Sequence, residues 1–248
     1  SPMSGHSKWH NIQAKKGKAD AARGRIFTKL GREISVAAKG NPNPDTNSKL
    51  ADAIAKAKAN NMPNDNIQRC IKKAAGELGN VNYETLVYEG YGPGGSALII
   101  NTLTDNKNRT AGDVRSTLSK CGGELGSTGC VSYMFSNKGL LVIERTLDLD
   151  EDTVTEYAIE AGADDILVHD DVFEVYTDPA AFSDVRKFLE GKGIEFLEAD
   201  VRMIPQSKIT LNAENVEKFE KLLDKLDELD DVQDVYHNVD LPEDEEEE

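Results

Sequence analysis

The chain has 248 residues, 38% of them apolar, which is enough to build ordinary hydrophobic cores in one large domain or in two to three small ones. The longest apolar runs, at 97–100 and 140–143, fall far short of the roughly 18 residues that a membrane span requires, and no apolar stretch typical of a secretory signal follows the N-terminal basic residues. The composition therefore predicts a globular, cytoplasmic protein that does not enter the membrane.

The charge is distributed unevenly along the chain. The formal net charge is -16, yet residues 1–76 hold 15 Lys and Arg against 5 Asp and Glu, a net of +10, and the remaining 14 basic and 40 acidic residues give -26. Such an asymmetry indicates a polyanionic partner for the basic part, and it would suit a basic protein as a partner for the acidic part.

Residues 1–78 are predicted to form a helical, basic domain, because their apolar residues recur at helical spacing and no alternating strand pattern occurs. Three helices are expected, at Ala19–Ala38, Ser48–Asn60 and Asp65–Ala75. In the first helix, Ile26, Leu30 and Ile34 fall on one side, while Arg25, Lys29 and Arg32 fall on the other. This basic stripe is expected to face solvent.

From Tyr83 onward the apolar period changes to two, which predicts strands alternating with helices. Expected strands are 83–91, 96–103, 131–135, 140–144, 165–168, 172–176, 194–197, 208–211 and 232–237. Expected helices are 110–120, 151–161, 179–190 and 213–229, the first of them beginning at a Thr110 and Asp113 capping box.

These elements predict an α+β protein in which a three-helix module is followed by two ferredoxin-like α/β domains, one inserted in the other. Residues 136–205 read as a complete βαββαβ unit, the inserted domain. Residues 79–135 and 206–240 together give the same order, a discontinuous domain. Residues 241–248 are expected to form an acidic tail that is disordered by self-repulsion.

No catalytic constellation is visible, so no enzyme activity, cofactor or metal is predicted. The four histidines do not converge, and the HSKWH spacing of His6 and His10 has no Cys or Glu partner that would favour a metal site. The three cysteines show no CxxC spacing. The Gly-rich stretch YGPGGS lacks the ending of a P-loop, which favours a tight hairpin turn over a nucleotide site.

Candidate nucleic-acid-binding residues lie in two places. The basic N-terminal segment contains the only tryptophan, which either stacks on an unpaired base or packs on the helices. The stretch TDNKNRT places cations just before a helix N-terminus, where they either bind phosphate or form a solvated loop. The candidate set is Lys8, Trp9, Lys15, Lys16, Lys18, Arg23, Arg25, Lys29, Arg32, Lys107, Asn108 and Arg109.

Several motifs resemble those of the YebC family, also called the PmpR family. They are GHSKW, RGRIFTKLGREI, MPNDNIQRCIKKA, YEGYGPGG, LTDNKNRT and GGELG, in this order over Gly5–Gly126. The resemblance extends to the mitochondrial translational activator of cytochrome c oxidase. It implies a helical N-terminal domain and two α/β domains, one of them discontinuous. Cys130 stands in GCVSYMF where the family pattern would have Ser, and QAKKGKADAARG is looser than the family's opening motif.

The resemblance implies two functions, because members are described as DNA-binding transcriptional regulators or as translation factors that act on ribosomes stalled at proline-rich stretches. The leading hypothesis is a non-enzymatic, nucleic-acid-binding regulator of gene expression, foremost a DNA-binding transcriptional regulatory protein. A ribosome-associated translation factor is the first alternative. A ligand-sensing module built on the ferredoxin-like units is the second, since such units occur with many functions.

Overall fold

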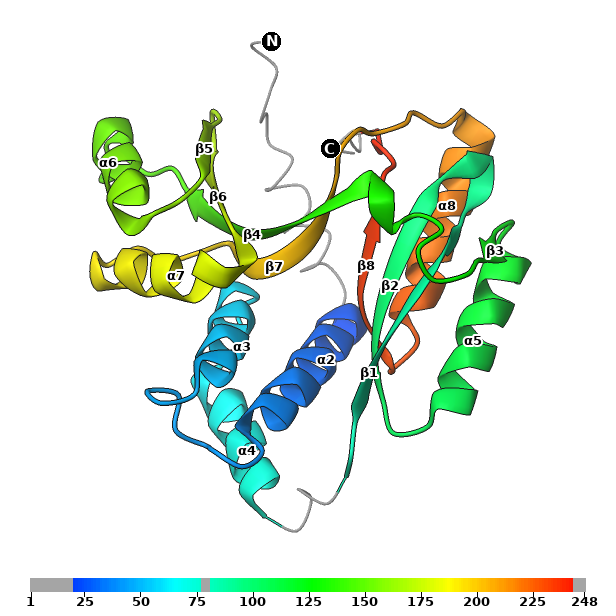
Figure 1. Ribbon diagram of the computed structural model, residues 1–248, viewed down its shortest axis with the longest axis horizontal. Helices are drawn as coiled ribbons and strands as arrows, with labels where there is room; N and C mark the ends of the chain where they lie inside the picture. The colour runs from blue at the N-terminus through cyan, green and yellow to red at the C-terminus, as the bar shows by residue number, and fades with distance from the viewer. Residues whose placement is uncertain (1–19, 77–80, 243–248) are drawn as a thin grey trace.

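The computed structural model of the protein describes residues 20–76 and 81–242 (Figure 1). Its N-terminal helices are α2 (Asp20–Ala38), α3 (Ser48–Ala59) and α4 (Asn64–Ala75), close to the predicted bounds. The side chain of Asn47 caps α3 by accepting a hydrogen bond from the backbone N–H of Leu50, and Pro63 precedes α4 in an extended conformation. Most of the predicted acidic tail lies outside the described residues.

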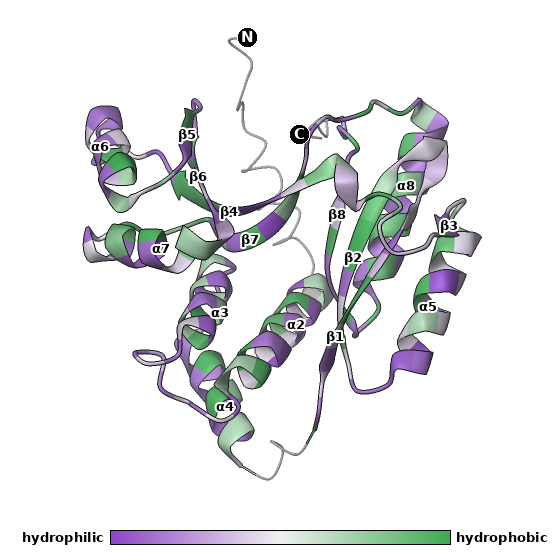
Figure 2. Cartoon of the chain, viewed as in Figure 1, coloured by the Kyte–Doolittle hydropathy of each residue, from purple (hydrophilic) through white to green (hydrophobic). Residues whose placement is uncertain are grey.

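The three helices pack around a small apolar core. It consists of Leu30, Ile34, Ala38, Leu50, Ala57, Met62, Ile67 and Ile71. Hydrophilic and hydrophobic residues alternate along α2, α3 and α4 in Figure 2, as helical periodicity requires. Within the described part of the chain, no helix is long and apolar enough to cross a membrane.

The inserted domain has the predicted βαββαβ order. Its elements are β4 (Phe135–Glu144), α6 (Glu151–Ala161), β5 (Asp165–Val168), β6 (Val172–Thr177), α7 (Phe182–Gly191) and β7 (Glu198–Pro205). The strands form an antiparallel sheet in the order β5-β6-β4-β7, so the first and third strands lie in the middle. Helices α6 and α7 cover one face of this sheet (Figure 1). The ferredoxin-like prediction is confirmed for this unit.

The discontinuous domain also contains a four-stranded antiparallel sheet. Its elements are β1 (Glu84–Tyr91), β2 (Ala97–Thr104), α5 (Lys107–Lys120), β3 (Glu124–Leu125), α8 (Ala213–Asp227) and β8 (Val232–His237). The order is β3-β1-β2-β8, with α5 and α8 packed on one face. Strand β2 is almost entirely buried and runs hydrophobic along most of its length (Figure 2).

The predicted turn at YGPGGS is confirmed, because β1 and β2 pair antiparallel across it. Gly94 and Gly95 have φ angles of 70° and 75°, a left-handed conformation that glycine adopts without strain. These glycines therefore serve the geometry of the hairpin.

Three predicted strands are wrong. Residues 208–211 form only an isolated bridge, between Ile209 and Val239, while β1 pairs with β2 in the middle of the sheet. Residues 131–135 include a 3-10 helix, Ser132–Met134, because the buried carboxylate of Glu89 on β1 accepts hydrogen bonds from three backbone N–H groups of this loop and fixes it against the sheet in a turned conformation. The strand expected at 194–197 begins only at Glu198.

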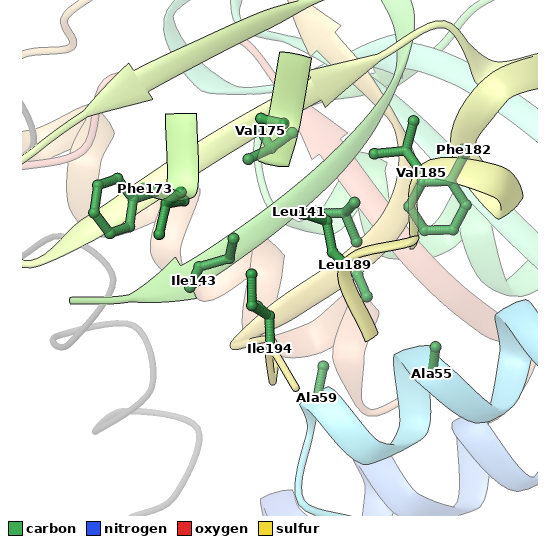
Figure 3. Close-up of a cluster of buried hydrophobic side chains, with 13 residues drawn as sticks. Ala55, Ala59, Leu141, Ile143, Phe173, Val175, Phe182, Val185, Leu189 and Ile194 are labelled. Carbon is green, nitrogen blue, oxygen red and sulfur yellow. The ribbon is translucent and has the colours of Figure 1, made fainter. Parts of the chain in front are cut away.

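The helical module packs directly against the inserted domain. Ala55 and Ala59 of α3 join the core formed by α6, α7 and their sheet, and Figure 3 shows them below Leu189 and Ile194. Beside this contact, Arg186 of α7 donates a hydrogen bond to the Asp52 carboxylate over 3.0 Å. Small alanine side chains allow the backbone of α3 to approach the domain closely.

A buried cluster of charges joins all three modules. The ammonium of Lys56 on α3 lies 3.0 Å from Glu33 of α2, 3.2 Å from Asp200 of β7 and 3.1 Å from Asp234 of β8. Burial alone would lower the pKa of Lys56, but the three carboxylates hold it well above its ordinary value. At Asp200, burial outweighs the attraction of Lys56, which two other carboxylates share, and raises the pKa to about 7. Burial raises the pKa of Glu33 for the same reason.

Candidate nucleic-acid interface

The structure locates seven of the twelve candidate residues. Lys8, Trp9, Lys15, Lys16 and Lys18 lie outside the described residues. Arg23 is exposed near the start of α2. The other six divide into a group that faces the discontinuous domain and a group that remains exposed.

The stripe of cations on α2 does not face solvent, so that prediction is wrong. Lys29 is only 7% exposed, and its ammonium donates hydrogen bonds to the backbone carbonyls of Leu229 (3.0 Å) and Val232 (2.5 Å). Burial lowers the pKa of Lys29, while Asp227 at 3.8 Å opposes this effect. Arg25 forms an ion pair with the same Asp227 at 3.0 Å. The stripe therefore contacts the end of α8 and the start of β8.

Arg32 and Arg109 converge on a single buried carboxylate, that of Asp231. Arg32 donates over 3.0 Å, Arg109 donates through two nitrogens over 3.0 and 2.9 Å, and the hydroxyl of Thr110 donates over 2.8 Å. Burial alone would raise the pKa of Asp231, but the hydrogen bonds from Arg109, Thr110 and Arg32 outweigh it and hold the pKa below its ordinary value. Arg109 also pairs with Asp105.

Replacing Asp231 by Asn is expected to lower the free energy of unfolding at pH 7 by about 2 kcal/mol, because the two arginines would lose their shared carboxylate. A carboxylate with a lowered folded pKa contributes stability above its ordinary pKa and loses it as the pH falls through the folded value. The difference between variant and unaltered protein should therefore shrink below about pH 4. Urea denaturation at pH 7 and pH 3 measures it, with the exposed neighbour Asp230→Asn as control.

The helix after TDNKNRT begins earlier than predicted. Helix α5 starts at Lys107, and the side chain of Asn106 caps it by accepting a hydrogen bond from the backbone N–H of Arg109 over 3.1 Å. The expected capping box at Thr110 is therefore wrong, because the Thr110 hydroxyl hydrogen-bonds Asp231 and the carbonyl of Asn106. Lys107 and Asn108 are exposed in the first turn of α5.

The helical module nevertheless keeps a basic surface. Its exposed cations are Arg23, Lys39, Lys49, Lys58, Arg69, Lys72 and Lys73, whereas Asp45 and Asp65 are the exposed acids among residues 21–76. Arg69, Lys72 and Lys73 follow one another at helical spacing on the side of α4 opposite Ile67 and Ile71, which are buried. Sequence reasoning missed this basic face, although the alternation of Ile67, Ile71 and the α4 cations was visible.

The histidines and carboxylates of the described residues do not form a metal centre. Among residues 20–76 and 81–242, no three His, Cys, Asp or Glu side chains are placed to hold a metal ion. His169 pairs with Glu174 in the inserted sheet, whereas His237 lies in the other sheet, where burial lowers its pKa to about 4. His6 and His10 lie outside the described residues.

Comparison with protein-family models accounts for most of the chain. Residues 7–77 match the TACO1/YebC protein N-terminal domain, and residues 83–239 match the TACO1/YebC second and third domain. The chain belongs to the TACO1/YebC family. In this TACO1/YebC protein, the first match contains α2, α3 and α4, and the second contains both sheets.

Relatives of this TACO1/YebC chain are similar over nearly their whole length. A "probable transcriptional regulatory protein" of Clostridium tetani is 59% identical over 98% of this chain and 99% of its own length, and one of Clostridium novyi is 61% identical over the same shares. A solved structure, that of a conserved hypothetical protein from Aquifex aeolicus, is 44% identical, covers 91% of this chain and 93% of its own, and superposes with a TM-score of 0.77. The fold described above is thus shared within the family.

Proposed function

We propose that this TACO1/YebC protein is a cytoplasmic, non-enzymatic regulator of gene expression that binds nucleic acid through the exposed cations of its helical module. The observation that carries the proposal is the charge of the surface of this module: among residues 21–76, seven Lys and Arg side chains are exposed but only two Asp side chains are. Four further cations of the module form ion pairs in its contacts with the other domains and are not counted among the seven. The printed names of the bacterial relatives, probable transcriptional regulatory proteins, support a regulatory role.

The proposed surface centres on the basic face of α4, formed by Arg69, Lys72 and Lys73, and includes Lys39. Lys107 and Asn108 at the start of α5 are proposed as further contacts. The N-terminal cations Lys8, Lys15, Lys16 and Lys18, which lie outside the described residues, are proposed as contacts from the sequence alone. Phosphate contacts dominate nucleic-acid affinity, so an exposed set of Lys and Arg on one module is the expected footprint. The acidic remainder of the chain would repel the polyanion and so orient it toward the helical module.

Changing Arg69, Lys72 and Lys73 together to Glu is expected to abolish most binding to DNA and RNA, because three cations of the contact surface become repulsive. The plot of log affinity against log salt concentration has a negative slope, and this slope should become shallower by about two to three units relative to the unaltered protein. Fluorescence titration of labelled DNA and RNA at several salt concentrations measures both effects.

A matched control changes the exposed lysines Lys218, Lys221 and Lys225 of α8 to Glu, which alters the net charge by the same amount on the acidic domain. This control should keep both affinity and salt slope. Equal losses in the two variants would show that overall charge, rather than the α4 face, governs binding. Crosslinking in cells then separates promoter DNA from ribosomal RNA as the target, and ribosomal RNA would favour the translation-factor alternative.

A further inference from the structure

A groove lies beside the basic face of α4, between α2, α4 and the segment that leads into β1. Its volume is about 510 Å³, within the roughly 300–1,000 Å³ typical of small-ligand sites. Its lining includes Phe27, Arg32, Val36, Lys39, Lys73, Val81 and Tyr83. Only Arg32 among these was a candidate residue from the sequence.

Apolar surface predominates in the lining of the groove, which includes two aromatic residues, Phe27 and Tyr83. Val36 and Val81 are each 37% exposed, and both line this groove, so they leave apolar surface open to a ligand. Helices α2 and α4 approach closely at its base, where a Cβ on Gly31 would lie 3.0 Å from the Cys70 sulfur. Burial raises the pKa of the Cys70 thiol, which favours its uncharged form and keeps this wall apolar.

The rim of the groove is cationic. Lys39 donates a hydrogen bond to the side-chain oxygen of Asn82 over 2.7 Å and so joins the end of α2 to the third wall. The Arg32 guanidinium lies over the Tyr83 ring at 4.5 Å, and Lys73 connects the rim to the α4 face. An apolar, partly aromatic interior inside a ring of cations matches a ligand with a flat apolar body and attached negative charges.

We propose that this groove receives an unpaired base of a single-stranded nucleic acid while Lys39, Lys73 and the α4 face contact the flanking phosphates. This rests on the nucleic-acid binding proposed above and specifies its substrate as single-stranded. A base in a duplex is stacked and paired, so it cannot enter a groove, whereas unpaired bases stack readily on protein side chains. The charge complementarity of rim and phosphate selects nucleic acid over a neutral ligand.

The test compares an oligothymidine strand with an abasic strand of equal length, because both carry the same phosphates and only one carries bases. The unaltered protein should bind the oligothymidine about tenfold more tightly, as expected for stacking of one base. Val36→Gln should remove this preference by making the interior polar, while both strands keep the same salt slope. The control is Val87→Gln, since Val87 is 49% exposed on β1, away from the groove.

A second variant, Val81→Gln on the opposite wall, should reproduce the loss, and circular dichroism confirms that each variant is folded. Equal affinity of the unaltered protein for the two strands would overturn the groove proposal while leaving the proposed function intact. Absence of binding to any strand would overturn both. Tighter binding to a duplex than to the single strand would also overturn the groove proposal and would assign the surface to duplex nucleic acid. An oligoglutamate peptide that displaces the strand, and does so less well from the Val36→Gln variant, would overturn it too and would assign the groove to an acidic protein.

Discussion

Replacing Lys56 by Met is expected to lower the free energy of unfolding at pH 7 to 8 by about 3–5 kcal/mol, because it leaves three carboxylates close together without their shared cation. Glu33, Asp200 and Asp234 come from three different modules, so their repulsion would act on the packing of the whole molecule. Urea denaturation followed by circular dichroism measures the change. Lys58→Met, an exposed neighbour on α3, should alter stability by about 0.5 kcal/mol or less.

The pH dependence distinguishes this electrostatic effect from a loss of packing. The folded pKa of Asp200, about 7, lies above its ordinary value, so between about pH 4 and pH 7 the folded state binds more protons than the unfolded state and stability falls as the pH rises. Without Lys56 the pKa values of Asp200 and Glu33 should rise further, which steepens this fall. The variant should therefore recover part of its stability at pH 5, and a deficit that is the same at pH 5 and pH 8 would contradict the account.

Changing Arg25, Lys29 and Arg32 together to Glu is expected to destabilise the protein by about 3–5 kcal/mol, rather than to remove a nucleic-acid contact alone. A glutamate at position 29 would leave the carbonyls of Leu229 and Val232 without a donor and would add a charge beside Asp227. Asp231 would lose one of its guanidinium partners. Thermal and urea denaturation measure the loss of stability.

The Arg69, Lys72 and Lys73 charge reversal is the matched comparison, since it makes the same change in net charge at exposed positions of α4. That variant should unfold within about 0.5 kcal/mol per substitution of the unaltered protein, yet lose nucleic-acid binding. A stable α2 variant that fails to bind would restore the stripe as a binding surface and contradict the role of these cations in holding the modules together.

Local signals in the sequence determined the existence and bounds of most elements. Helix α6 and strands β5 and β8 have the predicted ends, and the three N-terminal helices differ by one residue at most at each end. Capping residues, prolines and the period of apolar residues act over a few positions, so they are readable without knowledge of the rest of the chain. The same is true of the basic character of the helical module and of the hairpin at YGPGGS.

Contacts between distant residues were decided only by the tertiary structure. The amphipathic pattern of α2 shows that Arg25, Lys29 and Arg32 share a side, but the partners that cover this side, Asp227 and Asp231, lie about 200 residues away. Likewise, the local pattern of apolar residues cannot show that β1 pairs with other strands of the sheet while residues 208–211 form only an isolated bridge.

The charges of Lys56 and its carboxylates illustrate the same limit. Taken by itself in the sequence, each of these charged residues is typical of a solvated polar face. Only the packing of three modules places them within ion-pair distance in a buried site. A sequence specifies where charge lies along a helix or strand, because that depends on local geometry. Whether the charge meets water or an opposite charge depends on how separately folded surfaces are brought together, which is a property of the whole chain.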